Sequence, residues 1–205
     1  MEVVLIASGL ISLSLYQSLL AGEPVTDDRI AAIDTANVIL GVGSLVVTVG
    51  TGVAFIRWLL QARRNAVALG AGELVHSRHT AVWSWFIPII DLFLPYQVVK
   101  EIWQASAPAP EPEGGVPGVL RAWWGFWVAA TVLAQLGFRM NWGLGENSDW
   151  ADYSDVERVM LAAAVPSIVA AVLAMRVVRG LDDRQRARAL RLADETVHPA
   201  RAALA

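Results

Sequence analysis

Four apolar segments, separated by polar ones, set the pattern of this chain. The segments are residues 3–21, 36–60, 120–139 and 157–179. A helix of about 20 apolar residues crosses the hydrocarbon core of a bilayer, and it satisfies its backbone donors and acceptors internally. We therefore expect an all-α fold: a polytopic membrane helical bundle with four transmembrane helices in residues 1–180.

The composition favours the same membrane class. Of the 205 residues, 56% are hydrophobic and only 17% are charged, whereas a typical soluble domain has about 25% charged residues. The chain has nine tryptophans, a residue that is favoured at membrane interfaces. The net charge of −3 argues against a nucleic-acid partner, and the lack of cysteine excludes disulfides and thiolate chemistry.

The basic residues predict the orientation of the spans. Thirteen of the sixteen lie either between the second and third spans and at the ends of these spans that face each other, or at the end of the fourth span and after it. The connections after the first and third spans are acidic instead. Because cytoplasmic connections carry the excess of Lys and Arg, we expect a multi-pass protein of the cell membrane with both termini in the cytoplasm. The first span is expected to be retained, since Met1 and Glu2 do not form the basic start of a signal peptide.

Local signals mark the ends of the fourth span. Ser154, followed three residues later by Glu157, forms a capping-box pattern, and Gly180 follows the last apolar turn as a helix end. Residues 181–205 then form a basic cytoplasmic tail, which is either a helix on the membrane surface or on a partner, or a solvated tail. Residues 107–118, with four prolines and three glycines, are expected to be a linker.

Residues 80–106 are apolar, but they hold Pro88 and Pro95 with Asp91 between them. Proline removes a backbone donor and breaks or kinks a helix, and a full crossing would separate the basic residues on the two sides of this segment. We therefore expect a re-entrant or interfacial element: a short helix to about Pro88, a turn, and an amphipathic helix from Pro95 to Ser106. Five full spans, with the termini on opposite sides, are the alternative.

Several short motifs in the second span and in this segment are shared with a known family. They are, in order, Arg57-Trp58, Ala62-Arg63-Arg64-Asn65, Leu69-Gly70, Trp85-Phe86-Ile87-Pro88-Ile89, Pro95-Tyr96-Gln97 and Glu101-Ile102-Trp103-Gln104-Ala105-Ser106. Closely over residues 53–106, and more loosely over the four-span layout, the chain resembles the bacterial membrane family called domain of unknown function 4328. The resemblance implies a multi-span bacterial protein, often actinobacterial, and no activity. Asp91 departs from the asparagine expected there in the family.

The candidate functional residues lie in the same region. They are Pro88, Asp91, Pro95, Tyr96, Gln97, Glu101 and Trp103. Asp91 is the strongest candidate, because an ionisable group in an apolar membrane segment is costly and marks a functional site. We expect it to pair with Arg57, Arg63 or Lys100; the alternative is that it caps the helix that starts near Leu92.

For each of the other polar residues, the sequence allows two interpretations of its role. Glu101 either pairs with an arginine of residues 57–64, holding the segment against the second span, or belongs to a solvated face with Lys100. Arg57, Arg63 and Arg64 either bind anionic lipid headgroups or only set the topology. His76 and His79 are three residues apart, but zinc motifs carry more ligands than this pair and the chain has no cysteine, so we expect no metal and no cofactor.

Three functional hypotheses remain. The sequence has no nucleotide-binding loop, nucleophile elbow or Ser/His/Asp set, so we do not expect an enzyme. The first hypothesis is a non-enzymatic membrane scaffold or accessory subunit, in contact with the lipid bilayer and with a membrane protein partner or a second copy. The second is a small oligomeric channel or transporter that uses the Pro-broken segment around Asp91. The third is a lipid-modifying membrane enzyme with Asp91 or Glu101 as the base.

Overall fold

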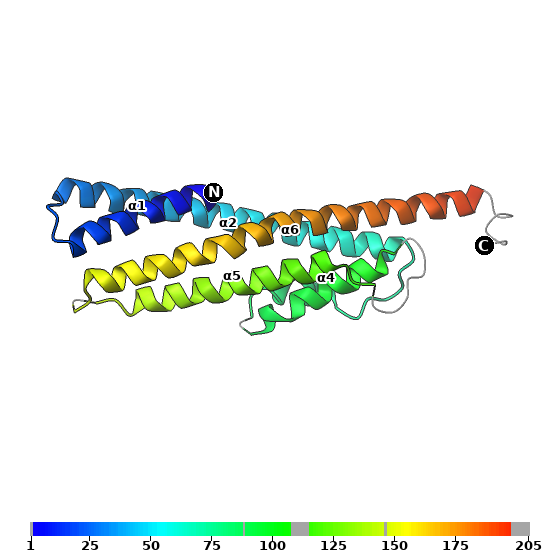
Figure 1. Cartoon of the computed structure of the whole chain (residues 1–205). Helices are drawn as coiled ribbons and strands as arrows, with labels where there is room; N and C mark the ends of the chain where they lie inside the picture. Colours follow the sequence, from blue (N-terminus) through cyan, green and yellow to red (C-terminus); the bar gives the residue numbers. More distant parts are fainter. Residues whose placement is uncertain (1, 88, 108–114, 146, 198–205) are drawn as a thin grey trace. The chain divides into compact units, whose positions relative to one another are not determined.

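The computed structural model describes residues 2–87, 89–107, 115–145 and 147–197, and it is built from helices (Figure 1). In chain order these are α1 (Glu2–Leu20), α2 (Asp27–Ala68), α3 (Arg78–Trp83), the 3₁₀ helix η1 (Ile90–Leu92), α4 (Leu94–Ala105), α5 (Gly118–Trp142) and α6 (Trp150–Val197). No strand occurs in the described ranges. Four helices, α1, α2, α5 and α6, are long and apolar enough to cross a membrane. The all-α prediction with four membrane-spanning candidates is confirmed.

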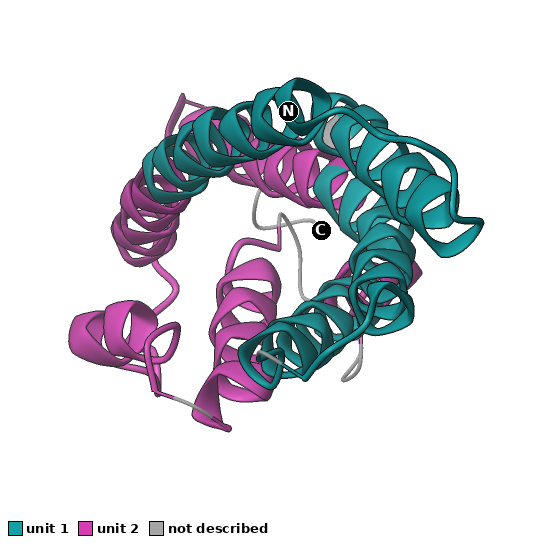
Figure 2. Cartoon of the chain, turned by 90° about the vertical axis from the view of Figure 1, so that its left-hand side faces the viewer, with its two compact units in different colours: residues 1–51, 125–171 teal, residues 52–124, 172–205 magenta. Residues whose placement is uncertain are grey.

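These helices divide between two compact units (Figure 2). Unit 1 comprises residues 1–51 and 125–171, with α1, the first part of α2, and the parts of α5 and α6 nearest their connection. Unit 2 comprises residues 52–124 and 172–205, with the end of α2, α3, η1, α4, the start of α5 and the second part of α6. All the candidate residues named from the sequence therefore belong to unit 2.

The apolar part of α2 presents its side chains outward. Its most apolar 18-residue window contains no buried residue, and Val38, Ile39 and Leu45 are 66%, 65% and 64% exposed. Exposed aliphatic surface is unfavourable in water, whereas lipid tails are as apolar as the side chains themselves. This surface agrees with the predicted membrane location.

Within unit 1, α1 packs on α2 through a polar contact and on α6 through aromatic rings. The side-chain amide of Asn37 in α2 donates to Ser12 Oγ (3.0 Å), and its oxygen accepts from Ser8 Oγ (2.5 Å). The ring of Tyr16 stacks on Trp150 of α6 with a centroid distance of 6.3 Å. Polar groups of α1 are thus satisfied by a neighbouring helix, as an apolar environment requires.

The start of α6 is capped by residues that precede the predicted ones. Asp149 Oδ1 accepts from the backbone N–H groups of Ala151 (2.9 Å) and Asp152 (3.1 Å), and Asp152 Oδ2 accepts from the N–H of Asp149 (3.1 Å). This reciprocal pair is the capping box of the helix. The prediction that Ser154 and Glu157 form it is wrong, because both lie inside α6.

α6 also continues past the glycine that was expected to end it. Gly180 lies within the helix, which reaches Val197. A Cβ on Gly180 would lie 2.9 Å from Cη2 of Trp103 in α4, so the glycine allows close packing of the two helices. The predicted helix end is therefore wrong. Beyond it, Leu181 and Gln185 are buried, so these turns belong to the core of unit 2.

Aliphatic side chains from four helices form that core. Seven of the larger ones are at most 1% exposed: Leu59 of α2, Val98, Val99 and Ile102 of α4, Leu120 of α5, and Val177 and Leu181 of α6. Burial of each such side chain stabilises a fold by about 1.5–3 kcal/mol. The core fixes α4 against the ends of the long helices, and α4 carries most of the candidate residues.

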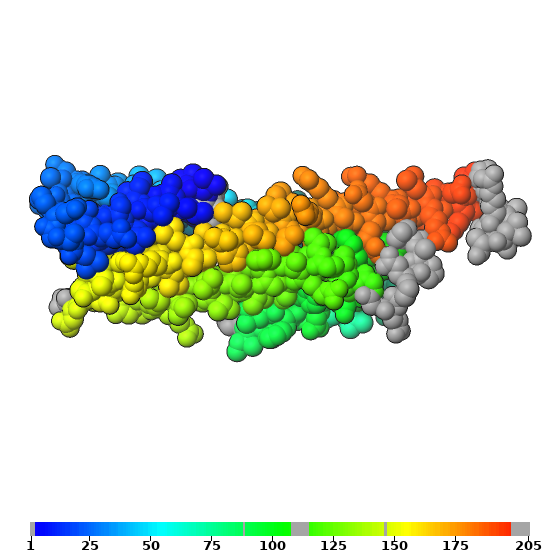
Figure 3. Space-filling view, in the orientation of Figure 1, coloured from blue at the N-terminus to red at the C-terminus, as the bar shows by residue number. Residues whose placement is uncertain are grey.

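The segment of residues 80–106 is interrupted as predicted, and the expected helix from Pro95 to Ser106 is confirmed within one residue at each end, whereas the first helix ends earlier than expected. α3 ends at Trp83, well before Pro88. α4 begins at Leu94 with Pro95 in its first turn, where a missing backbone N–H costs no hydrogen bond. In the space-filling view, η1 and the start of α4 form a green lobe at the lower edge (Figure 3). The re-entrant placement of this segment in the membrane stays a prediction.

One residue of the interruption has an unusual backbone. Ile89 has a φ of 72°, a left-handed conformation that is rare for a β-branched residue. It directly precedes η1, and no side chain accepts a capping hydrogen bond at the start of this helix. Pro88 and the predicted linker residues 108–114 lie outside the described residues.

Candidate functional site

Glu101 of α4 anchors the loop that precedes α3. Its carboxylate accepts hydrogen bonds from the backbone N–H groups of Val75 and His76, the second at 3.1 Å from Oε2. Oε2 also lies 2.6 Å from Nδ1 of the His76 ring. The two side chains are only 17% and 19% exposed. We call Arg63, Val75, His76 and Glu101 the loop anchor.

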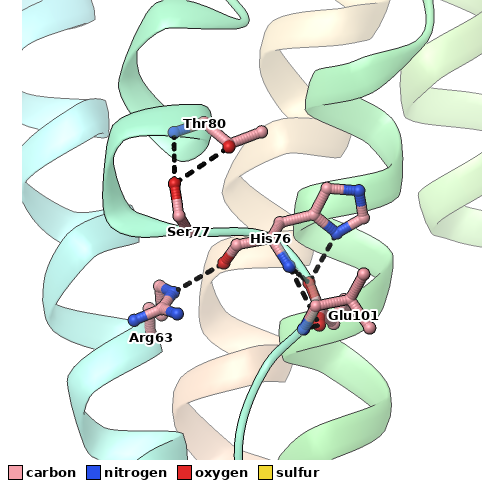
Figure 4. Close-up of polar contacts among 6 residues, drawn as sticks. Arg63, His76, Ser77, Thr80 and Glu101 are labelled. Carbon is pink, nitrogen blue, oxygen red and sulfur yellow. Dashed lines mark hydrogen bonds and ion pairs between the residues drawn. The ribbon is translucent and has the colours of Figure 1, made fainter.

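Arg63 of α2 reaches the same loop from the other side. Its Nε donates to the backbone carbonyl oxygen of His76 at 3.1 Å. Figure 4 shows His76 between Arg63 and Glu101. The expected pairing of Glu101 with an arginine of residues 57–64 is therefore wrong, because a loop residue separates the two and supplies the partner of each.

α3 starts directly after this anchor. Ser77 Oγ accepts from the backbone N–H of Thr80 (3.1 Å) and caps the helix (Figure 4). The cap and the loop anchor are adjacent in the chain, so the direction in which α3 leaves the loop is fixed by both.

A second polar cluster joins the ends of α2 and α4 to α6. Arg188 Nε donates to the carbonyl oxygen of Leu69 (2.9 Å), and its Nη1 donates to those of Ala105 (2.6 Å) and Ala107 (3.2 Å). Carbonyl groups at the C-terminal ends of helices have no partner within the helix. A guanidinium supplies donors in a planar fork, together with a positive charge that suits the negative end of the helix dipole.

Gln185, one turn earlier on α6, completes this cluster. Its amide nitrogen donates to the carbonyl oxygen of Ala62 (2.8 Å) and to Ser106 Oγ (3.0 Å), and its oxygen accepts from Asn65 Nδ2 (3.1 Å). The side chain is 5% exposed, and three of its hydrogen-bonding positions are filled. We call Asn65, Ser106, Gln185 and Arg188 the helix-end junction.

Aromatic rings surround these polar clusters. The guanidinium of Arg184 lies 4.9 Å from the ring centroid of Trp103, a cation–π contact. Tyr96 packs on Trp124 at 6.1 Å, and the indole N–H of Trp124 donates to the carbonyl oxygen of Leu92 (3.0 Å). Tyr96 and Trp103 therefore have packing roles in unit 2.

Asp91 does not take either of its predicted roles. It lies half-buried in η1, and in the described part of the chain its carboxylate pairs with neither Arg57, Arg63 nor Lys100. The start of α4 carries no side-chain cap, so the capping alternative is also wrong. The aspartate and its expected partners lie on separate elements, and the loop anchor occupies Arg63.

The other candidates are placed as follows: Pro95 is buried, Lys100 is half-buried, and Gln97, Arg57 and Arg64 are exposed. Sequence reasoning missed Asn65, Gln185 and Arg188. The last two could have been found from the sequence. Leu181, Gln185 and Arg188 have the spacing of residues on one face of a helix, so the polar pair is expected on the same side as the apolar Leu181.

The described residues contain no group of three or more His, Cys, Asp or Glu side chains that could hold a metal ion. His76 is engaged by Glu101 and His79 is exposed. The arrangement of the loop anchor and the helix-end junction is suited to holding segments together.

The sequence profile of one protein family, described as "Domain of unknown function (DUF4328)", matches residues 21–183. The chain belongs to the DUF4328 family. The matched range includes Arg63, His76 and Glu101 and ends before Gln185 and Arg188. No curated protein and no solved structure matches the chain. The description of DUF4328 assigns no activity.

Proposed function

We propose that the chain is a non-enzymatic membrane scaffold or accessory subunit, held in the bilayer by α1, α2, α5 and α6. The observation that carries the proposal is the use of polar side chains in unit 2. Glu101, Gln185 and Arg188 all bind backbone groups of other segments. Side chains engaged in this way stabilise helix ends and loops, whereas acid–base catalysis needs a group within reach of a substrate.

We further propose that both termini and the connection between α2 and α5 lie in the cytoplasm. The distribution of basic residues supports this orientation, because arginine and lysine are retained on the cytoplasmic side. Arg57 and Arg64 are exposed on α2, and the described structure gives neither an ion pair. Their chemistry suits anionic lipid headgroups at the membrane surface.

Purification of the protein from its own membranes in a mild detergent tests the scaffold proposal. The expected result is a second membrane protein in a fixed molar ratio, retained through size-exclusion chromatography. A double variant, Arg57→Ala with Arg64→Ala, tests the lipid contribution by loss of binding to vesicles that contain anionic lipid. Arg186→Ala is the matched control, because Arg186 is also exposed and has an exposed partner, Asp183.

Solute flux or lipid turnover by the purified chain alone, reconstituted in proteoliposomes, would contradict the scaffold proposal. One observation favours a channel or transporter as the second candidate: Asp91 is half-buried without a side-chain partner in the described structure, next to the left-handed Ile89. In that case Asp91→Asn abolishes flux and leaves folding unchanged. Equal flux in the variant would remove this candidate.

A further inference from the structure

One carboxylate in unit 1 has no partner among the residues that the structure describes. Glu157 of α6 is half-buried, and a Cβ on Gly9 of α1 would lie only 2.5 Å from its Oε1. The carboxylate thus fills space that a side chain at position 9 would need. Among the described residues it accepts no hydrogen bond and forms no ion pair, and the adjacent Arg158 binds Asp155 instead (2.6 Å).

Two buried hydroxyl groups lie on the helices that hold this carboxylate. Ser154 is fully buried, and its hydroxyl has no hydrogen-bond partner within the described chain. It precedes Glu157 by three residues, so the two share a face of α6. Ser12 of α1 is 1% exposed; it accepts from Asn37, and its own proton is donated to no described residue.

The packing of α1 on α6 places these groups at similar positions along the axes of the two helices. At one end, Tyr16 of α1 contacts Trp150 and Tyr153 of α6, with ring centroids 6.3 Å and 5.9 Å away. At the other end, Gly9 of α1 contacts Glu157. The helices are therefore antiparallel here. Ser12 lies between the two contacts on α1, and Ser154 lies between them on α6.

A half-buried carboxylate and the buried Ser154 hydroxyl, neither of which has a hydrogen-bond partner in the described chain, are unfavourable unless something binds there, because desolvated polar groups without partners cost free energy. The available atoms are all oxygens, the ligands that hard cations prefer. Only one of them is charged, which matches a single positive charge, whereas divalent cations use more carboxylates.

We propose that Glu157, Ser154 and Ser12 form a binding site for a small monovalent cation such as sodium. Glu157 supplies the charge, and the two serine hydroxyl oxygens supply neutral ligands from facing helices. Gly9 is required because it leaves the room that the carboxylate occupies. The site goes beyond the scaffold proposal, since binding of an ion requires neither flux nor turnover.

Binding of radioactive sodium to the purified full chain in detergent tests the site. The wild type is expected to bind sodium in competition with unlabelled sodium chloride and not with choline chloride. Glu157→Gln is expected to lower the affinity by at least tenfold, and Ser154→Ala by about tenfold. Asp155→Asn, two residues away and exposed, is expected to bind as the wild type does. Sodium should also raise the unfolding temperature of the wild type relative to choline, and not that of Glu157→Gln.

The proposal is overturned if the wild type binds no sodium, or if Glu157→Gln binds it with unchanged affinity. Should Glu157→Gln not fold, Ser154→Ala decides, because it keeps the charge and removes one ligand; unchanged sodium affinity in that variant overturns the site. Neither result bears on the scaffold proposal, which rests on unit 2.

Discussion

The Glu101 carboxylate accepts from the backbone N–H groups of Val75 and His76 and contacts the His76 ring. Replacement by alanine removes the acceptor of these two N–H groups, one of which belongs to the half-buried His76. We expect Glu101→Ala to lower the free energy of unfolding by about 1–3 kcal/mol, measured by denaturation in detergent. Gln104→Ala, exposed on the same helix, is the control and should change little. Equal stability of the two variants would show that the anchor contributes nothing.

Part of the loop anchor can be predicted from the sequence. A carboxylate on the polar side of an amphipathic turn, close to a Pro-broken segment, indicates that Glu101 holds that segment in place. Its partner cannot be read in the same way. His76 lies 25 residues earlier in a loop, and the conformation of a loop without periodicity does not follow from residue spacing.

Asp91 shows the same limit more severely. The cost of an ionisable group in an apolar segment singles it out from the sequence. Whether it meets a cation depends on how η1 is oriented, and the turn around Ile89, with its φ of 72°, sets that orientation. Nothing in the residue pattern predicts a left-handed isoleucine.

Close packing of α4 on α6 depends on Gly180. A methyl group there would lie 2.9 Å from the Trp103 ring, which is buried and has little freedom to move. We expect Gly180→Ala to destabilise the protein by about 1–3 kcal/mol. Gly125→Ala in α5, where no atom lies within 4 Å of the added Cβ, should be neutral or stabilise by up to about 1 kcal/mol. Thermal unfolding of both variants in one detergent checks the difference in sign.

The cap of α6 gives a second prediction about an element. Asp149→Ala removes the acceptor for two N–H groups and should cost about 1 kcal/mol. Ser154→Ala, measured without sodium, removes a hydroxyl that makes no hydrogen bond in the described chain, so no loss of helix capping is expected. Differential scanning calorimetry of the two variants distinguishes the caps. Destabilisation by Ser154→Ala alone would support the sequence-based cap instead.

These two helix ends explain what the sequence does and does not determine. The existence and type of α1, α2, α5 and α6 follow from long apolar runs. Asp149 with Asp152, and Ser154 with Glu157, both fit a capping pattern, and contacts of the first turn with Tyr16 favour the earlier one. A glycine at position 180 is compatible both with a helix end and with close packing of two helices. Only its proximity to Trp103, which is far away in the sequence, shows that the second applies.

For the whole molecule, residues 181–188, which follow Gly180, are part of a folded unit. Leu181 is buried in unit 2, and Gln185 and Arg188 donate hydrogen bonds to backbone carbonyl oxygens there. A chain that ends at Gly180 is therefore expected to aggregate or to be degraded, whereas one that ends at Ala193 keeps these contacts and should remain monodisperse. Size-exclusion chromatography in detergent compares them. A monodisperse shorter chain would restore the view of this segment as a dispensable tail.

The orientation in the membrane is also testable on the whole chain. Reporter fusions at the two ends should both be active in the cytoplasm, because an even number of spans returns the chain to its starting side. A fusion after Glu23 should report from the opposite side. Ends in different compartments would favour the five-span alternative, in which residues 80–106 cross fully.

The helix-end junction has a consequence for chain length. The side chains of Gln185 and Arg188 donate hydrogen bonds to backbone carbonyl oxygens in α2, directly after α2 and in α4. These bonds form only if both side chains lie on the correct side of α6 and at the correct position along its axis. One residue inserted after Arg179 would rotate everything beyond it by about 100° and shift it by about 1.5 Å. A substitution in this part of α6 removes the contacts of one side chain. An inserted residue would instead displace Leu181, Gln185 and Arg188 from their partners at the same time. Spacing is therefore more tightly constrained here than the identity of any single amino acid.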